Sequence, residues 1–75
     1  MENAELDKLR QVYREAVAVW IAAIREEEAL VTPDHSVQAV DRWEEAGFRE
    51  EEARNRAKIA KKAYEELLRR VNFGF

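Results

Sequence analysis

The chain has 75 residues, no cysteine, one histidine and a formal net charge of −3. A domain of this size buries only about 60% of the surface that its unfolded chain exposes, so it needs a further source of stability, such as a disulfide, a metal or a partner subunit. The composition excludes disulfides, thiolate metal sites and histidine-rich metal sites. We therefore treat residues 1–75 as one domain and expect self-association to enlarge its core.

The amino terminus, "MENAELDKLR", mixes acidic and basic residues and is not typical of a secretory leader or a transit peptide. The longest wholly apolar run covers residues 16–24. As a helix this run would be about 13 Å long, far short of the thickness of a bilayer. These features predict a soluble, cytoplasmic protein that has no membrane partner.

Apolar residues in the first third recur at alternating steps of three and four, which is typical of a helix in a coiled coil or bundle. They are Leu6, Leu9, Tyr13, Ala16, Trp20, Ala23 and Leu30. The spacing predicts a first helix over about 3–30, with Asn3 as its N-cap. Further apolar residues flank this stripe: Val12 and Val19 on one side, Val17, Ile24 and Val31 on the other, and Ile21 further round. A stripe this wide predicts contact with two or more helices, some of them from another subunit.

The stretch "VTPDHS" predicts the next boundary. Thr32 is a favourable N-cap, and Pro33 suits the first position of a helix, where its missing N–H costs nothing. We expect a short second helix over about 33–46, with Val37, Val40 and Trp43 on one face.

Gly47 interrupts sequence that otherwise favours helix, and it has two interpretations. As a left-handed residue after a helix end, it would let Phe48 pack against Trp43 across a turn. Asn72 and Phe73 repeat this arrangement at the carboxyl end of the chain. This interpretation predicts a third helix over about 49–71, packed antiparallel to the first helix in an all-α bundle.

The alternative is a two-helix hairpin in which the second and third helices are continuous. Small and apolar positions from Ala39 to Val71 keep an alternating spacing of four and three through Gly47. A glycine in the middle of a helix costs only about 1 kcal/mol relative to alanine. We favour the break, because the following residues 50–52 are all glutamate and suit the first turn of a helix.

The stretch "AVDRWEEAGFREEEARNRA" also resembles the first turn of ubiquitin-associated domains, with Gly47, Phe48 and Ala53 at the corresponding positions. The likeness covers fewer than twenty residues and lacks the Met of that turn. We interpret it as the same helix-capping chemistry and not as membership of the family.

Residues that could carry chemistry are few. His35 is the only imidazole, Ser36 the only serine, and no glycine-rich phosphate loop is present. No glutamate has a histidine three residues later, as di-iron bundles require. We predict a protein that is not an enzyme and holds no metal or cofactor.

The predicted function is therefore that of a small interaction or oligomerisation module that acts as a homo-oligomer, with a dimer as the expected form and a further protein partner left open. The candidate contact residues are Val17, Trp20, Ile24, Trp43, Phe48, Tyr64, Phe73 and Phe75. The two phenylalanines of the "NFGF" tail either seal the end of the bundle or form an exposed hook.

The alternative function is nucleic-acid binding. Residues 53–75 hold seven bases and two acids, in contrast to the acidic remainder. The candidate phosphate contacts are Arg54, Lys58, Lys61, Lys62 and Arg69. The net negative charge of the chain weighs against this alternative.

Overall fold

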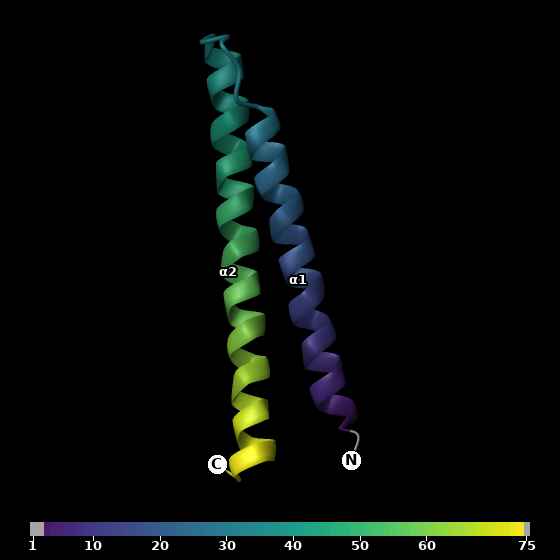
Figure 1. Cartoon of the computed structure of the whole chain (residues 1–75). Helices are drawn as coiled ribbons and strands as arrows, with labels where there is room; N and C mark the ends of the chain where they lie inside the picture. Colours follow the sequence, from purple (N-terminus) through teal and green to yellow (C-terminus); the bar gives the residue numbers. More distant parts are fainter. Residues whose placement is uncertain (1–2, 75) are drawn as a thin grey trace.

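The computed structural model describes residues 3–74 and contains two helices, α1 (Ala4–Ala29) and α2 (Val37–Phe73). They pack against each other in opposite directions and form a hairpin, with both ends of the chain at the same end of the molecule (Figure 1). The all-α class is confirmed, but the predicted three-helix count is wrong. The arrangement is the two-helix alternative. The molecule is a rod of 56 × 18 × 13 Å, and its radius of gyration is 17.2 Å. A compact chain of this length would have a radius of gyration of about 11 Å.

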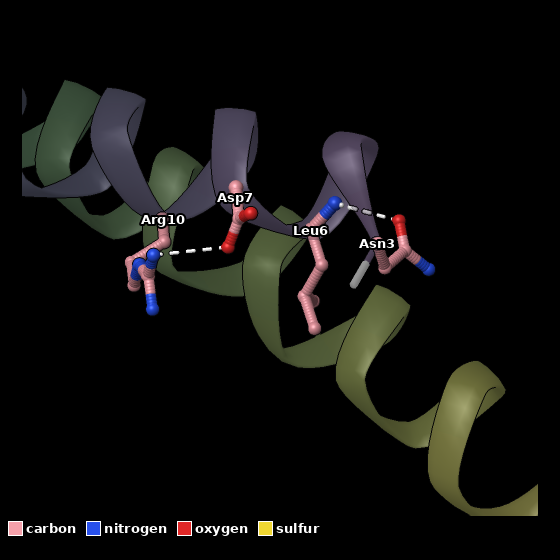
Figure 2. Close-up of polar contacts among 4 residues, drawn as sticks. All are labelled: Asn3, Leu6, Asp7 and Arg10. Carbon is pink, nitrogen blue, oxygen red and sulfur yellow. Dashed lines mark hydrogen bonds and ion pairs between the residues drawn. The ribbon is translucent and has the colours of Figure 1, made fainter. Parts of the chain in front are cut away.

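The start of α1 agrees with the prediction. The Asn3 side chain accepts a hydrogen bond of 3.0 Å from the Leu6 N–H (Figure 2). Glu5 and Asp7 lie in the first turn, where the helix dipole favours acids, and Asp7 pairs with Arg10 at 2.9 Å. The carboxyl end of α1 has the reverse pattern, because its last turn carries the glutamates 26–28 and no basic residue.

The predicted start of the second helix at Pro33 is wrong, because α2 begins at Val37. Thr32 does not cap a helix, since its hydroxyl oxygen accepts a bond from the Asp34 N–H within the connector. The Asp34 carboxylate accepts bonds from both the N–H and the hydroxyl of Ser36. Ser36, held in this way, accepts a bond of 3.2 Å from the Ala39 N–H and is the N-cap of α2.

The predicted break at Gly47 is also wrong, because the glycine lies inside α2 and has no positive φ. There is consequently no turn like that of a ubiquitin-associated domain, and no helix begins at residue 49. Phe48 does not fold over Trp43 and is 70% exposed. Packing explains the difference, since α1 runs alongside and buries Ala46 on one side of Gly47 and Ala53 on the other. The contact along the whole helix outweighs a propensity cost of about 1 kcal/mol.

At the carboxyl end, the left-handed residue is Gly74 and not Asn72. Gly74 has φ 75°, and its N–H donates to the Arg70 carbonyl at 3.0 Å. Asn72 and Phe73 are helical. Glycine adopts the left-handed conformation without the steric cost that asparagine pays, so the helix ends two residues later than predicted.

The seam between the helices is built on small residues. The buried apolar residues are Ala23, Ala46, Ala53, Ala57, Ala60 and Leu67. None of the described large side chains is fully buried. The helices lie closest together near the connector and separate toward the termini (Figure 1). The buried alanines allow this close approach, and nearer the termini the rings of Tyr13 and Tyr64 stack between the helices with centroids 6.4 Å apart.

A Gly47→Ala variant should be more stable than the natural chain. The added Cβ would lie 3.6 Å from Oε1 of Glu27, which is ordinary van der Waals contact. We expect a gain of about 0.5–1 kcal/mol in the free energy of unfolding, because alanine loses less backbone entropy in a helix. Thermal unfolding followed by circular dichroism measures it. Gly74→Ala is the matched control, since its positive φ predicts no gain. A lower melting temperature for Gly47→Ala would contradict the continuous helix.

Candidate interaction surface

The hairpin has two long flanks, one on each side of the seam. The polar flank carries the Glu26–Arg49 ion pair at 2.7 Å between the helices and the Glu52–Arg56 pair along α2. A shallow pocket of about 330 Å³ lies between them. The lining residues are Val19, Ala22, Ala23, Glu26, Arg49, Glu52, Ala53 and Arg56. The ion pairs of this flank are formed within one chain, and Val12 and Val19 on the same side are 44% and 56% exposed.

The opposite side, which we call the apolar flank, carries Val17, Ile21 and Ile24 of α1 and Val31 of the connector. Val31 lines a pocket together with Val40 of α2. Ile24 precedes Val31 by seven residues and Val17 precedes it by fourteen, so all three lie on the same side. Ile21 and Ile24 are 43% and 38% exposed, and Val17 is half-buried. Helix α2 therefore leaves these side chains partly uncovered.

The connector end of the apolar flank is hollowed around Trp43, which is 45% exposed. One pocket of about 210 Å³ lies on its connector side, and its lining residues are Leu30, Val31, Thr32, Asp34, His35, Ala39, Val40 and Trp43. A second pocket of about 240 Å³ has as its lining residues Glu27, Trp43, Glu44, Gly47, Phe48 and Glu51. Trp43 borders both pockets because the first turns of α2 extend beyond the end of α1, so that only the connector covers them (Figure 1).

Two of the candidate aromatic residues have partners inside the hairpin. Trp20 Nε1 donates a hydrogen bond of 2.7 Å to Oε1 of Glu50, across the seam. Tyr64 stacks on Tyr13. Both side chains are half-buried, so they join α1 to α2 and present only part of their surface to a partner.

The other candidates are placed as follows. Val17, Ile24 and Trp43 lie on the apolar flank, whereas Phe48 and Phe73 are exposed on α2. Phe75 lies outside the described residues. The tail phenylalanine that is described, Phe73, is the last residue of α2.

The candidate phosphate contacts share one broad side of α2. At about 100° per residue, Arg54, Lys58 and Lys61 fall within one narrow stripe on the apolar flank, with Lys62 and Arg69 further toward the outer face. Lys61 lies 3.8 Å from Glu65, and the Arg54 Nε atom is buried without a hydrogen-bond partner among the described residues. All five lie on one continuous helix, because no turn interrupts α2.

Folding into a hairpin separates the charges of the chain. The connector half, residues 20–52, holds ten acids and three bases. The open half is formed by residues 3–19 and 53–74, which hold five acids and ten bases. The rod therefore has an acidic half of charge −7 and a basic half of charge +5.

One feature of α1 was missed at the level of sequence. Arg14, Val17, Ile21, Ile24 and Glu28 follow a second alternation of four and three steps beside the seam. This second stripe becomes visible when the charged residues Arg14 and Glu28 are counted together with the apolar ones. Arg14 and Glu28 are exposed, and neither forms an ion pair within residues 3–74.

No known protein family, curated protein or solved structure matches the chain. Neither of the two described helices combines the length and apolar character that a bilayer span requires. Residues 3–74 bring together no group of three or more acidic or histidine side chains that could hold a metal ion.

Proposed function

We propose that the protein is a small non-enzymatic helical module that works by self-association, with the apolar flank as its contact surface and a dimer as its working form. The observation that carries this proposal is the composition of the hairpin core. The core consists almost entirely of alanine, whereas Ile21, Ile24 and Trp43 stay accessible on one flank. A pair of helices joined in this way buries too little apolar surface to be stable alone.

The exposed area supports the same proposal. The chain exposes 6186 Å², whereas a compact monomer of its mass, 8.8 kDa, would expose about 4,800 Å². A compact dimer of twice this mass would expose about 7,900 Å², so each chain would bury about 2,200 Å² in the contact. An interface of this size belongs to the class of obligate dimers.

Sedimentation equilibrium tests the proposal. We expect the natural chain to be a dimer at micromolar concentration and an Ile21→Glu variant to dissociate at least tenfold more readily, because a carboxylate would enter an apolar contact. Ala22→Glu is the matched control, since Ala22 is exposed and lines the pocket of the polar flank. A natural chain that is a well-folded monomer would contradict the proposal.

The basic stripe of α2 supports a second hypothesis, nucleic-acid binding. It predicts that the chain retards DNA or RNA in a gel at low salt and that changing Lys58, Lys61 and Lys62 to Glu removes the shift. A chain that dimerises and binds no nucleic acid at low salt leaves only the first proposal.

A further inference from the structure

We infer that the second copy docks antiparallel, so that the acidic connector half of each hairpin lies against the basic open half of the other. This inference rests on the proposed self-association and adds its geometry. The two-fold axis is perpendicular to the rod, lies between the two apolar flanks and passes close to Ile21. Such an axis places α1 against α1 of the second copy and α2 against α2 of the second copy, both pairs antiparallel.

The stripe on α1 is self-complementary about Ile21. Val17 and Ile24 lie four and three residues from Ile21, and Arg14 and Glu28 lie seven residues from it on either side. In an antiparallel pair, Ile21 therefore meets Ile21, Val17 meets Ile24, and Arg14 meets Glu28, each from the other copy. A parallel pair would instead place the two acidic connector halves against each other and the two basic open halves against each other.

The end of α1 gives a further reason for this pairing. Glu28 lies in the last turn, where the helix dipole disfavours acids and no basic residue of α1 compensates. The Glu26 carboxylate, in the same turn, forms an ion pair with Arg49 of α2. The second copy's Arg14 would supply the corresponding cation to Glu28.

The matching faces of α2 follow the same symmetry. Glu26 pairs with Arg49 and Tyr13 stacks on Tyr64, so Ile21 is level with about residue 55 of α2. Glu51 and Lys58 lie four and three residues from that level, and therefore face each other between copies.

In this arrangement, side chains of the second copy lie next to the two pockets around Trp43. Val40 and Leu68 lie on opposite sides of residue 55 at similar distances, so Leu68 of one copy approaches the connector-side pocket of the other. The second pocket is rimmed by Glu27, Glu44 and Glu51, and it comes level with Lys58 and Lys61 of the second copy.

Shape favours the same orientation. Each hairpin is a wedge, narrow at the connector and wide at the termini (Figure 1). Two wedges packed antiparallel give a bundle of even width, whereas two parallel wedges would leave the wide ends poorly filled.

Distances between spin labels test the orientation. The chain has no natural cysteine, so Gln38→Cys and Asn72→Cys give single labelling sites at exposed positions near the two ends of α2. Both lie 17 residues from residue 55. The antiparallel dimer predicts a separation of about 51 Å between two labels at residue 38, and a short separation between residue 38 of one copy and residue 72 of the other. Pulsed dipolar spectroscopy measures both.

The outcomes separate the two proposals. A short distance between two labels at residue 38 would overturn the antiparallel geometry and leave the dimer intact. Samples that sediment as monomers and give no intermolecular distance would overturn the proposed function itself.

A charge exchange tests the α1 contact. Arg14→Glu and Glu28→Arg should each raise the dimer dissociation constant about tenfold. The effect is large because each substitution is present in both copies and therefore disrupts both Arg14–Glu28 contacts. The double variant should recover most of the natural affinity. Lys8→Glu, on the side of α1 opposite this stripe, is the control and should change little. Additive losses in the double variant would contradict the pairing.

Discussion

An Ala57→Leu variant is expected to lose about 1–3 kcal/mol of stability, because a seam built for alanine has no space for a larger side chain. Ala57 is 3% exposed and lies in the middle of the alanine run that faces α1. A leucine there must push the two backbones apart, which also loosens the packing of Ala53 and Ala60 on the adjacent turns. For a domain of this size, each kcal/mol corresponds to a change of roughly 4–8 °C in the melting temperature.

Ala18→Leu is the matched control for this experiment. Ala18 is an exposed residue of α1, and a leucine there has nearly the same helix propensity as alanine. We expect a change within about 0.5 kcal/mol. Thermal unfolding of both variants, at one protein concentration, measures the difference. If the two variants melt alike, the close approach of the helices at the alanine seam is wrong.

A Trp20→Ala variant should lose about 2–3 kcal/mol of its free energy of unfolding. This loss is smaller than that expected for a completely buried tryptophan, because Trp20 is half-buried. The loss has two parts. The indole ring fills much of the space between the helices beside the alanines, and its N–H satisfies Glu50, which is part-buried in the seam. Removing the ring leaves that carboxylate without its donor.

A second pair of variants separates these two parts. Trp20→Phe keeps an aromatic ring and removes the donor, so it should cost about 1 kcal/mol. Combining Trp20→Phe with Glu50→Leu removes both polar partners and should recover this loss, since the seam is then apolar throughout. Urea unfolding of the four proteins forms a double-mutant cycle. A coupling energy near zero would show that the hydrogen bond between Trp20 and Glu50 adds nothing.

The sequence pattern identified most of the seam correctly. The spacing from Leu6 to Leu30 predicted the side of α1 that faces α2, and every residue of this stripe is at least half-buried. Ala53, Ala57 and Ala60 belong to the alternating spacing from Ala39 to Val71, and all three are buried. These predictions succeed because a repeat of three and four residues fixes the buried face regardless of where a helix starts or ends.

Helix ends were predicted less well, because several residues competed for each role. Thr32 and Ser36 can both cap a helix, and the Asp34 carboxylate, which holds Ser36, decides between them. Gly47 and Gly74 can both end a helix, and only Gly74 does so. The difference is the presence of α1 alongside Gly47, a long-range contact that a local capping pattern does not contain.

The candidate contact residues stay predictions, and the structure shows where each of them lies. Val17 and Ile24 were selected from the excess width of the apolar stripe and Trp43 as a large aromatic, and all three lie on the apolar flank. Trp20 and Tyr64 were selected as large aromatics, and their partners within the hairpin depend on the register between α1 and α2. That register could not be read from one helix alone.

The different lengths of the two helices have a consequence for the dynamics of the chain. The first turns of α2 extend past the end of α1, and their hydrogen bonds are protected by the connector alone (Figure 1). Local opening should therefore begin in this segment and spread toward Ala53, while the middle of the rod stays closed. A docked second copy would cover the same segment with its open half, so that assembly would slow the opening of the end of α2 farthest from both chain termini.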